Sequence, residues 1–167
     1  MSAQAVQRTD LLSRAWRGYQ KIRRPADLWL CLRVLGWLCL VTVLLRWVRL
    51  PLLLSWLTPT RMRKKNISAR VDKIVSLTDT CLAVWPGRSN GRCLSRSLTL
   101  YRLLRESGLP VVVNFGLMPS GKKAVGHCWL SLEDDEDCRP VFENQEPGDR
   151  FINMLRHPGQ QDSHLRA

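Results

Sequence analysis

Hydrophobic positions recur with helical spacing over residues 93–107, and this predicts a helix there. The side chains that share one face of it are Leu94, Leu98, Tyr101 and Leu104. Gly108 is expected just beyond the last turn, because glycine readily adopts the left-handed backbone conformation found there. Ser89 or Asn90 is predicted as the N-cap. Cys93 then lies in the first turn, where free backbone N–H groups and the helix dipole favour a thiolate.

Beyond this helix the pattern changes to that of strands and turns. Residues 109–117 predict a buried strand, 119–123 a turn and 125–132 a second strand. The acidic run 133–137 is expected at the solvated tip of a hairpin. Residues 139–143 are expected to return from that tip as a last strand, antiparallel to the second one.

The N-terminal half is dominated by an apolar segment, residues 28–57, which Pro51 interrupts. Its charged residues are Arg33, Arg46 and Arg49. A membrane span needs about 20 apolar residues, whereas the longest run between arginines, 34–45, holds twelve. We therefore expect two helices that pack on the C-terminal half of the chain, with an interfacial membrane helix and a true span as the alternatives. Residues 67–83 predict a further amphipathic helix.

The length of 167 residues suits one domain with a helical extension. We expect residues 1–83 to form a helical region that packs on the core, 84–156 to form the catalytic region, and 157–167 to form a flexible tail. Asp149 is predicted to cap a short helix that runs through Leu155. The catalytic region alone would bury too little apolar surface for comfortable stability, so the N-terminal helices are expected to complete its core.

The formal net charge of +12 suits a nucleic acid or an anionic membrane surface as a partner. However, the basic residues are scattered over both halves and no nucleic-acid-binding motif is present, so nucleic-acid binding is not predicted. No cleavable signal is expected, because the polar segment 1–27 is too long and no small-residue cleavage site follows the apolar run. The default compartment is the reducing cytoplasm, with membrane association as the alternative noted for residues 28–57.

Several features have simple structural interpretations. Cys31, Cys39 and Cys81 are expected to be small buried hydrophobic residues. A zinc site is not predicted, because the six cysteines show no C-x-x-C spacing. Residues 116–123, GLMPSGKK, nearly spell a phosphate-binding loop. That motif must lead into a helix, and here it leads into a predicted strand, so we interpret it as a β-turn with exposed lysines.

One group of residues has the composition of a catalytic site: a cysteine at a helix start, a histidine on a strand and a carboxylate beyond it. Cys93 is the predicted nucleophile and His127 its general base. If the last two strands pair about Asp135, position 127 faces position 143, and directly opposed Cβ atoms lie about 4.5–5.5 Å apart. Glu143 is therefore predicted to orient the imidazole, with a surface glutamate that ends a strand as the alternative.

Alternation along the strand predicts the neighbours of His127. Trp129 shares its face, whereas Cys128 points to the opposite face and is expected in the core. Asp137 lies too early, in the hairpin tip, to be the third catalytic member. Asn144 points to the other face unless a bulge shifts the register.

The order of helix cysteine, strand histidine and strand carboxylate resembles the papain/transglutaminase-like superfamily, and the local sequence resembles its lasso-peptide leader peptidases, of the microcin-J-processing type. Their pattern is roughly C-x-x-(R/A)-(S/A)-L, a leucine-rich helix, a glycine, an apolar strand ending in glycine, and (A/G)-H-A-W-V. The matching residues here are Cys93, Arg96, Ser97, Leu98, Leu103, Leu104, Gly108, Gly116 and Gly126 to Leu130. That family usually has aspartate as its third member, where this chain has Glu143.

The resemblance implies an α+β fold, with the cysteine at a helix N-terminus, an antiparallel sheet that carries the histidine and the acid, and an apolar helical N-terminal half. It implies a cysteine peptidase that removes the leader from a ribosomally made lasso-peptide precursor, with Cys93, His127 and Glu143 as catalytic residues. The implied partners are that precursor, a separate small leader-recognition protein and a macrolactam-forming cyclase.

Some of these relatives are described as ATP-dependent, but the sequence shows no nucleotide site, so no cofactor is predicted. Two alternatives to a peptidase stay open. One is a transglutaminase-like acyltransferase, in which an amine takes the place of water. The other is a non-catalytic, membrane-associated protein that binds the precursor through the same fold and is anchored by residues 28–57.

Overall fold

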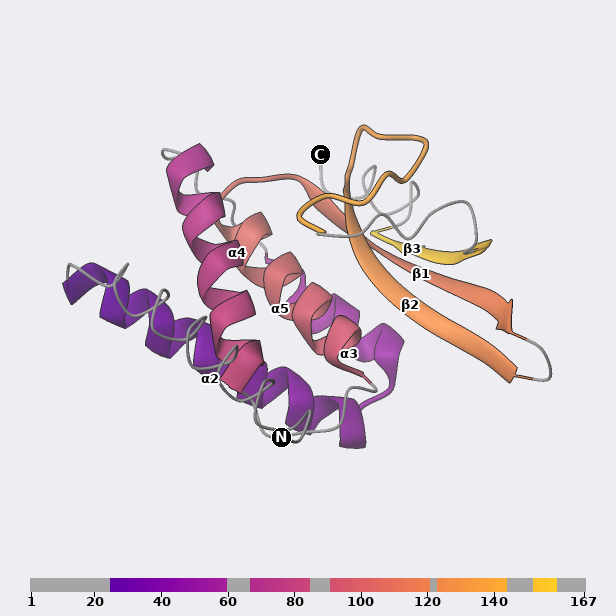
Figure 1. Ribbon diagram of the computed structural model, residues 1–167, viewed down its shortest axis with the longest axis horizontal. Helices are drawn as coiled ribbons and strands as arrows, with labels where there is room; N and C mark the ends of the chain where they lie inside the picture. Colours follow the sequence, from indigo (N-terminus) through magenta and orange to yellow (C-terminus); the bar gives the residue numbers. More distant parts are fainter. Residues whose placement is uncertain (1–24, 60–66, 85–90, 121–122, 144–151, 159–167) are drawn as a thin grey trace, which may run out of the picture.

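The structure, a computed structural model, describes residues 25–59, 67–84, 91–120, 123–143 and 152–158. In this part of the chain the helices gather on one side and an antiparallel sheet on the other (Figure 1). The elements are α2 (Pro25–Trp47), α3 (Leu50–Leu57), α4 (Ile67–Val84), α5 (Arg92–Glu106), β1 (Val111–Ser120), β2 (Lys123–Leu132) and β3 (Ile152–His157). The predicted α+β class is confirmed.

The sheet has the order β2-β1-β3, so the first strand is the central one. β1 and β2 pair without a break, and Gly116 lies opposite His127. β1 ends at Ser120 and β2 begins at Lys123, so the phosphate-loop-like residues 116–123 lead into a strand, as predicted. β3 pairs with the other edge of β1, with a register shift between Phe115 and Gly116.

The short helix predicted through Leu155 is wrong, because residues 152–157 form β3 instead. A helix of one or two turns is marginal by itself, since few hydrogen bonds offset its nucleation cost. The open edge of β1 offers a ladder of backbone partners to the same residues, interrupted by one register shift. Asp149, the predicted cap, lies outside the described residues.

α5 is the central helix, because it contacts α2, α3, α4, β1 and β2. Its predicted apolar face is confirmed: Leu98, Tyr101 and Leu104 are fully buried. The Tyr101 hydroxyl lies 2.9 Å from Thr58 Oγ1, which in turn lies 3.2 Å from His157 Nε2. One hydrogen-bonded chain therefore joins α5 to the end of α3 and to the last strand.

The end of α5 follows the predicted glycine. Gly108 has a φ of +96°, which is the left-handed region. Its N–H donates to the Arg105 carbonyl at 3.0 Å, and the Leu109 N–H donates to the Leu104 carbonyl at 3.1 Å. This pair of bonds is the Schellman motif. It satisfies the last carbonyls of α5 and turns the chain directly into β1.

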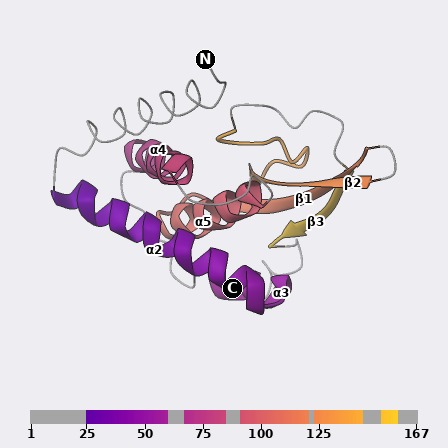
Figure 2. The same ribbon diagram turned by 60° about the horizontal axis from the view of Figure 1, so that its bottom comes forward.

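The apolar segment of the N-terminal half forms the predicted pair of helices. α2 ends at Trp47, and α3 begins at Leu50 with Pro51 in its first turn, where a missing N–H costs no helical hydrogen bond. The inner side of α2 is buried against the domain through Val34, Leu38 and Val41. Figure 2 shows α2 on the outside of the helical layer, away from the sheet.

Two ion pairs also fasten α2. Arg33 pairs with Glu106 of α5, and Asp27, which is buried, pairs with Lys73 of α4. The outer side of α2 is exposed, so the expectation of buried helices holds for only one face. Cys39 lies on that exposed side, and its predicted burial is wrong, whereas Cys81 is buried as expected.

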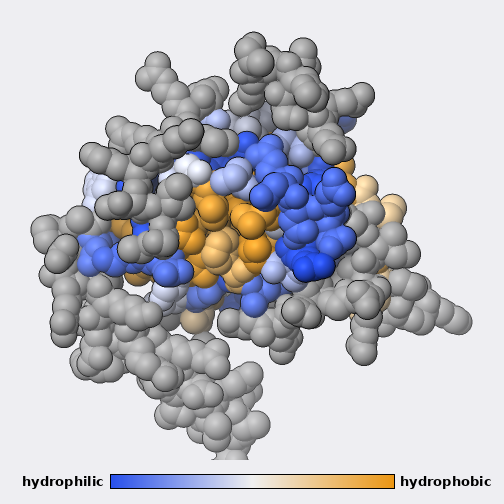
Figure 3. All heavy atoms as spheres, turned by 90° about the horizontal axis from the view of Figure 1, so that it is seen from above, coloured by the Kyte–Doolittle hydropathy of each residue, from blue (hydrophilic) through white to orange (hydrophobic). Residues whose placement is uncertain are grey.

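The acidic run after β2 is solvated, as predicted. Asp134, Glu136 and Asp137 are exposed, and Asp135 accepts hydrogen bonds from the backbone N–H groups of Asp137 and Arg139 at 3.2 and 2.9 Å. The molecule seen from above has hydrophilic residues around a central apolar area (Figure 3). The Asp135 carboxylate therefore stabilises the exposed turn of the acidic loop.

Candidate functional site

Cys93 is the second residue of α5, in the first turn, where sequence reasoning placed it. The N-cap is Gly91 rather than the predicted Ser89 or Asn90, and it makes no side-chain cap. The reason is conformational: the chain enters α5 with a φ of +94° at this position, which glycine adopts without strain. Cys93 is half-buried, and the first backbone N–H groups of the helix have no partner within the helix itself.

A buried hydrogen bond fastens α5 to β2 one turn beyond Cys93. The Ser97 hydroxyl donates to the carbonyl of Cys128 at 2.9 Å. Cys128 follows His127 and points into the core, as predicted, with 2% of its surface exposed. This bond therefore sets the start of α5 beside the segment of β2 that carries the histidine.

Burial dominates the electrostatics of the Cys128 thiol. Burial raises the pKa of the Cys128 thiol well above its ordinary value, and the hydrogen bond with Ser97 opposes that rise. Negative charge on Cys93 or on Glu143 raises the pKa further. The Cys128 thiol is therefore neutral near pH 7.

His127 contacts the predicted carboxylate directly. Its Nε2 lies 3.1 Å from Glu143 Oε2, and both side chains are largely shielded from solvent. Trp129 stacks on the imidazole, with ring centroids 5.9 Å apart and planes at 16°. The Trp129 Nε1–H donates to the Cys138 carbonyl at 2.8 Å, which fixes the indole in place. The imidazole is therefore oriented on its edge by an acid and on its face by an aromatic ring.

The route by which Glu143 reaches His127 differs from the predicted one. Residues 139–143 form no strand, only an isolated bridge between Leu130 and Val141, with the Val141 N–H donating to Leu130 at 2.8 Å. The predicted register would have paired Leu130 with Pro140. The expected pairing of positions 127 and 143 is thus off by one residue.

Backbone conformation explains this departure. Cys138 and Phe142 have φ values of +55° and +64°, so the chain leaves the extended conformation on both sides of the bridge. Pro140 has no N–H to donate to a ladder. The left-handed turn at Phe142 breaks the alternation of side chains. Glu143 consequently turns towards His127 although Val141, two residues earlier, faces Leu130.

Arg96 holds this irregular segment and was given no role by sequence reasoning. Its Nε and Nη2 donate to Asp79 of α4 at 2.6 and 3.2 Å, and Nη2 also donates to the Phe142 carbonyl at 2.7 Å. Its Nη1 lies 4.0 Å from Glu143. The available signals were its position one turn after Cys93 and its match to the family pattern, and neither points to Asp79, which is distant in sequence.

The structure therefore brings His127 and Glu143 into contact. Cys93 lies in the first turn of α5, one turn before Ser97, which bonds to the residue after His127. Asp137, the rejected candidate, pairs with Arg139 at 2.8 Å in the exposed loop. Asn144, the other one, lies outside the described residues. Among the described residues, no group of three or more His, Cys, Asp or Glu side chains is placed to hold a metal ion.

Comparison with known proteins gives one match, to a protein family. No curated protein and no solved structure matches the chain. Residues 37–156, well over half of the chain, match the transglutaminase-like superfamily. The match includes the second half of α2 and every residue of the site described above. The members of this superfamily are typically cysteine-dependent enzymes, and this chain has a cysteine at a helix start and a histidine in contact with an acid. The chain belongs to the transglutaminase-like superfamily.

Proposed function

We propose that this protein is a cysteine peptidase that removes the leader from a ribosomally made lasso-peptide precursor. The observation that carries the enzymatic part is the 3.1 Å contact of Glu143 with His127, which lies on a strand that packs against α5, the helix with Cys93 as its second residue. The lasso-peptide substrate rests on the sequence pattern around Cys93 and His127. The precursor, a small leader-recognition protein and a macrolactam-forming cyclase are the partners proposed on the same basis.

The contact through Nε2 supports one assignment of roles to the two ring nitrogens. When Nε2–H donates to the Glu143 carboxylate, the lone pair of the neutral ring lies on Nδ1. Nδ1 is then the atom that takes the proton of Cys93. The carboxylate fixes this tautomer and stabilises the imidazolium that forms, as the acid of a catalytic triad does.

The proposed reaction has two halves. The Cys93 thiolate attacks the scissile carbonyl, and backbone N–H groups at the start of α5 are candidates to stabilise the oxyanion. Collapse of the intermediate breaks the C–N bond, and the leaving amine takes the proton from Nδ1. Water, deprotonated by His127, then hydrolyses the thioester and releases the leader with a carboxyl end.

A groove next to the acid offers a place for the peptide. Its volume is about 510 Å³, and its lining residues are Asp72, Val75, Ser76, Asp79, Thr80, Ala83 and Phe142. One wall is therefore α4 and the other is the residue that precedes Glu143. Its mixture of apolar, hydroxyl and carboxylate groups suits an extended peptide with apolar and basic or hydroxyl side chains.

The test is cleavage of the precursor by the purified protein together with its leader-recognition partner, followed by mass spectrometry. Cys93→Ala should abolish leader release, while Cys138→Ala, at another half-buried cysteine, should cleave normally. Full cleavage by the Cys93 variant would refute the nucleophile. Release of the leader as an amide of an added amine, rather than as an acid, would identify an acyltransferase instead.

The third member is tested separately, by cleavage rates at equal folded concentration. Glu143→Gln should slow cleavage by about tenfold or more, because the amide cannot stabilise an imidazolium. Asp137→Ala and Asn144→Ala should each retain most of the rate. A silent Glu143→Gln beside a crippled Asn144→Ala would transfer the role to Asn144.

A further inference from the structure

The outer face of α2 is apolar and exposed along its whole length. Its residues recur at intervals of three and four, and they are Trp29, Leu32, Gly36, Leu40, Val43 and Trp47. Trp47 is 85% exposed and Trp29 is 70% exposed. On α3, Trp56 is 63% exposed. Soluble proteins rarely expose such a continuous apolar surface to solvent, and such surfaces usually mark an interaction site.

The opposite face of α2 determines what kind of interaction is compatible with the fold. Residues Asp27–Trp47 are long and apolar enough to cross a membrane by length and composition. However, Val34 and Leu38 are fully buried against the domain, and Arg33 pairs with Glu106. A spanning helix would lose this packing and carry Arg33 into the hydrocarbon, which is unfavourable. The helix is therefore placed to lie along a surface rather than to pass through one.

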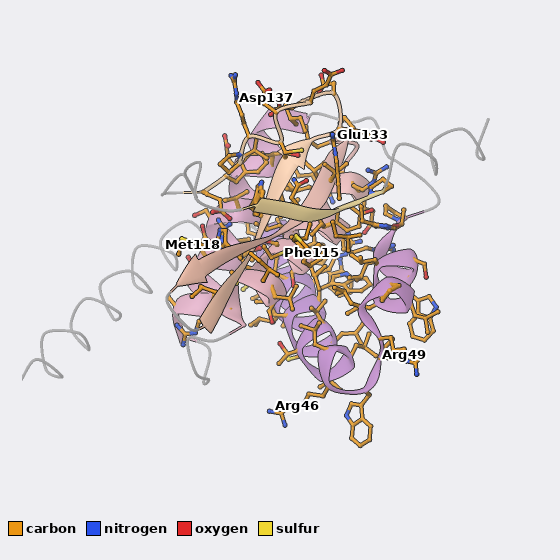
Figure 4. All side chains as sticks on the ribbon, turned by 90° about the vertical axis from the view of Figure 1, so that its right-hand side faces the viewer. Arg46, Arg49, Phe115, Met118, Glu133 and Asp137 are labelled. Atoms are coloured by element: carbon orange, nitrogen blue, oxygen red, sulfur yellow. The ribbon has the colours of Figure 1, made fainter. Side chains whose placement is uncertain are left out.

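The charges around this face favour an anionic surface. Arg46 and Arg49 flank Trp47 and are exposed, and tryptophan beside arginine is typical of residues at the headgroup level of a bilayer. Figure 4 shows Arg46 and Arg49 at one end of the molecule and the acidic residues Glu133 and Asp137 at the other. An anionic surface at the first end attracts the arginines and leaves the acids farthest away.

We propose that α2 and α3 dock the protein on an anionic lipid bilayer, with α2 in the plane of the interface and the tryptophans of its outer face among the headgroups. Arg46 and Arg49 contact lipid phosphates in this orientation, and the acidic loop points into solution. The inference rests on the exposed face and the distribution of charge, and it does not depend on the peptidase assignment.

The experiment is flotation of the full-length protein with vesicles of phosphatidylcholine, with and without phosphatidylglycerol. The protein should bind the vesicles that contain phosphatidylglycerol and bind pure phosphatidylcholine weakly. The pair Trp47→Ser and Trp56→Ser should lower the partition coefficient by about tenfold or more. Both side chains are exposed, so circular dichroism should show an unchanged fold.

A charge-matched pair isolates the electrostatic part. Arg46→Gln should lower binding by about fivefold, whereas Arg139→Gln, which removes the same charge in the acidic loop, should leave binding nearly unchanged. Failure of the folded protein to bind either vesicle would overturn the proposal. So would binding that resists high salt and alkaline wash, since that is the behaviour of a span. A dimer in sedimentation that Trp47→Ser dissociates would assign the face to a second copy instead.

Discussion

Replacing Arg96 by alanine should slow cleavage and lower stability, because this side chain joins α4 to the segment that carries Glu143. Arg96 donates to Asp79 through two nitrogens and to the Phe142 carbonyl at 2.7 Å. Its side chain is 18% exposed, so water replaces these bonds only in part. Alanine would leave the Phe142 carbonyl without its charged donor.

The magnitude follows from the partners. A hydrogen bond to a charged group contributes about 1.5–3 kcal/mol. The Asp79 side chain is 41% exposed, so its ion pair with Arg96 adds little, about 0–1 kcal/mol. The left-handed backbone at Phe142 is itself unfavourable by about 1–3 kcal/mol. Without Arg96 this backbone is expected to relax and to move Glu143. An increase of about 1.4 kcal/mol in the activation free energy from that displacement lowers the rate tenfold.

The assay pairs urea denaturation with the cleavage rate. We expect Arg96→Ala to lose about 1.5–3 kcal/mol of unfolding free energy and about tenfold in kcat. Arg96→Lys should be intermediate, because an ammonium cannot form the fork that spans both partners. Arg139→Ala, at an exposed arginine, is the matched control. An unchanged kcat in folded Arg96→Ala, or an equal loss in the control, would refute the reasoning.

Three further predictions concern the thiols and the core. Iodoacetamide near neutral pH should alkylate Cys93 before Cys128, because Cys128 is buried. Peptide mass spectrometry of samples taken over time measures the two alkylation rates, and equal rates would contradict the prediction. Burial, reinforced by Cys31, raises the pKa of Cys81 from 9.0 to about 12. The unfolded chain therefore loses this proton first, so the free energy of unfolding should fall as pH rises from 9 towards 12, and less so in Cys81→Ala. Leu38→Ala should cost about 2–5 kcal/mol in urea denaturation, whereas Leu40→Ala on the outer face should cost within about 0.5 kcal/mol; equal losses would mean that both faces are packed.

Local patterns were enough to predict most elements. The period of apolar residues predicted α4 and α5, and the glycine rule located the end of α5 at Gly108. Pro51 correctly marked the break between α2 and α3. These features depend on residues within one or two turns, so the sequence carries them directly. The packing of α2 and α3 on the domain also followed from the apolar composition, but which face stays exposed depends on tertiary contacts.

The parts that sequence reasoning missed depend on contacts between distant residues. The pairing of residues 152–157 with β1 needs an open sheet edge, which no local pattern reveals. Positive φ values at Cys138 and Phe142 replaced the predicted last strand, and neither residue type predicts them. The contact between His127 and Glu143 was expected from a ladder that does not form. Arg96 contacts the segment that carries Glu143, which is more than 40 residues away in the sequence, and local periodicity cannot predict such a contact.

The strand order β2-β1-β3 has a consequence for biosynthesis. The hairpin of β1 and β2 is complete once residue 132 is made, but the second edge of β1 stays unpaired until residues 152–157 follow. During synthesis from the N-terminus the growing chain therefore presents an unsatisfied strand edge, a template for pairing with another chain. Synthesis that ends between residues 132 and 152 would give a fragment that has most of the core and an unpaired, aggregation-prone strand edge. Quality control of such truncated chains therefore matters more for this order than it would if the central strand were translated last.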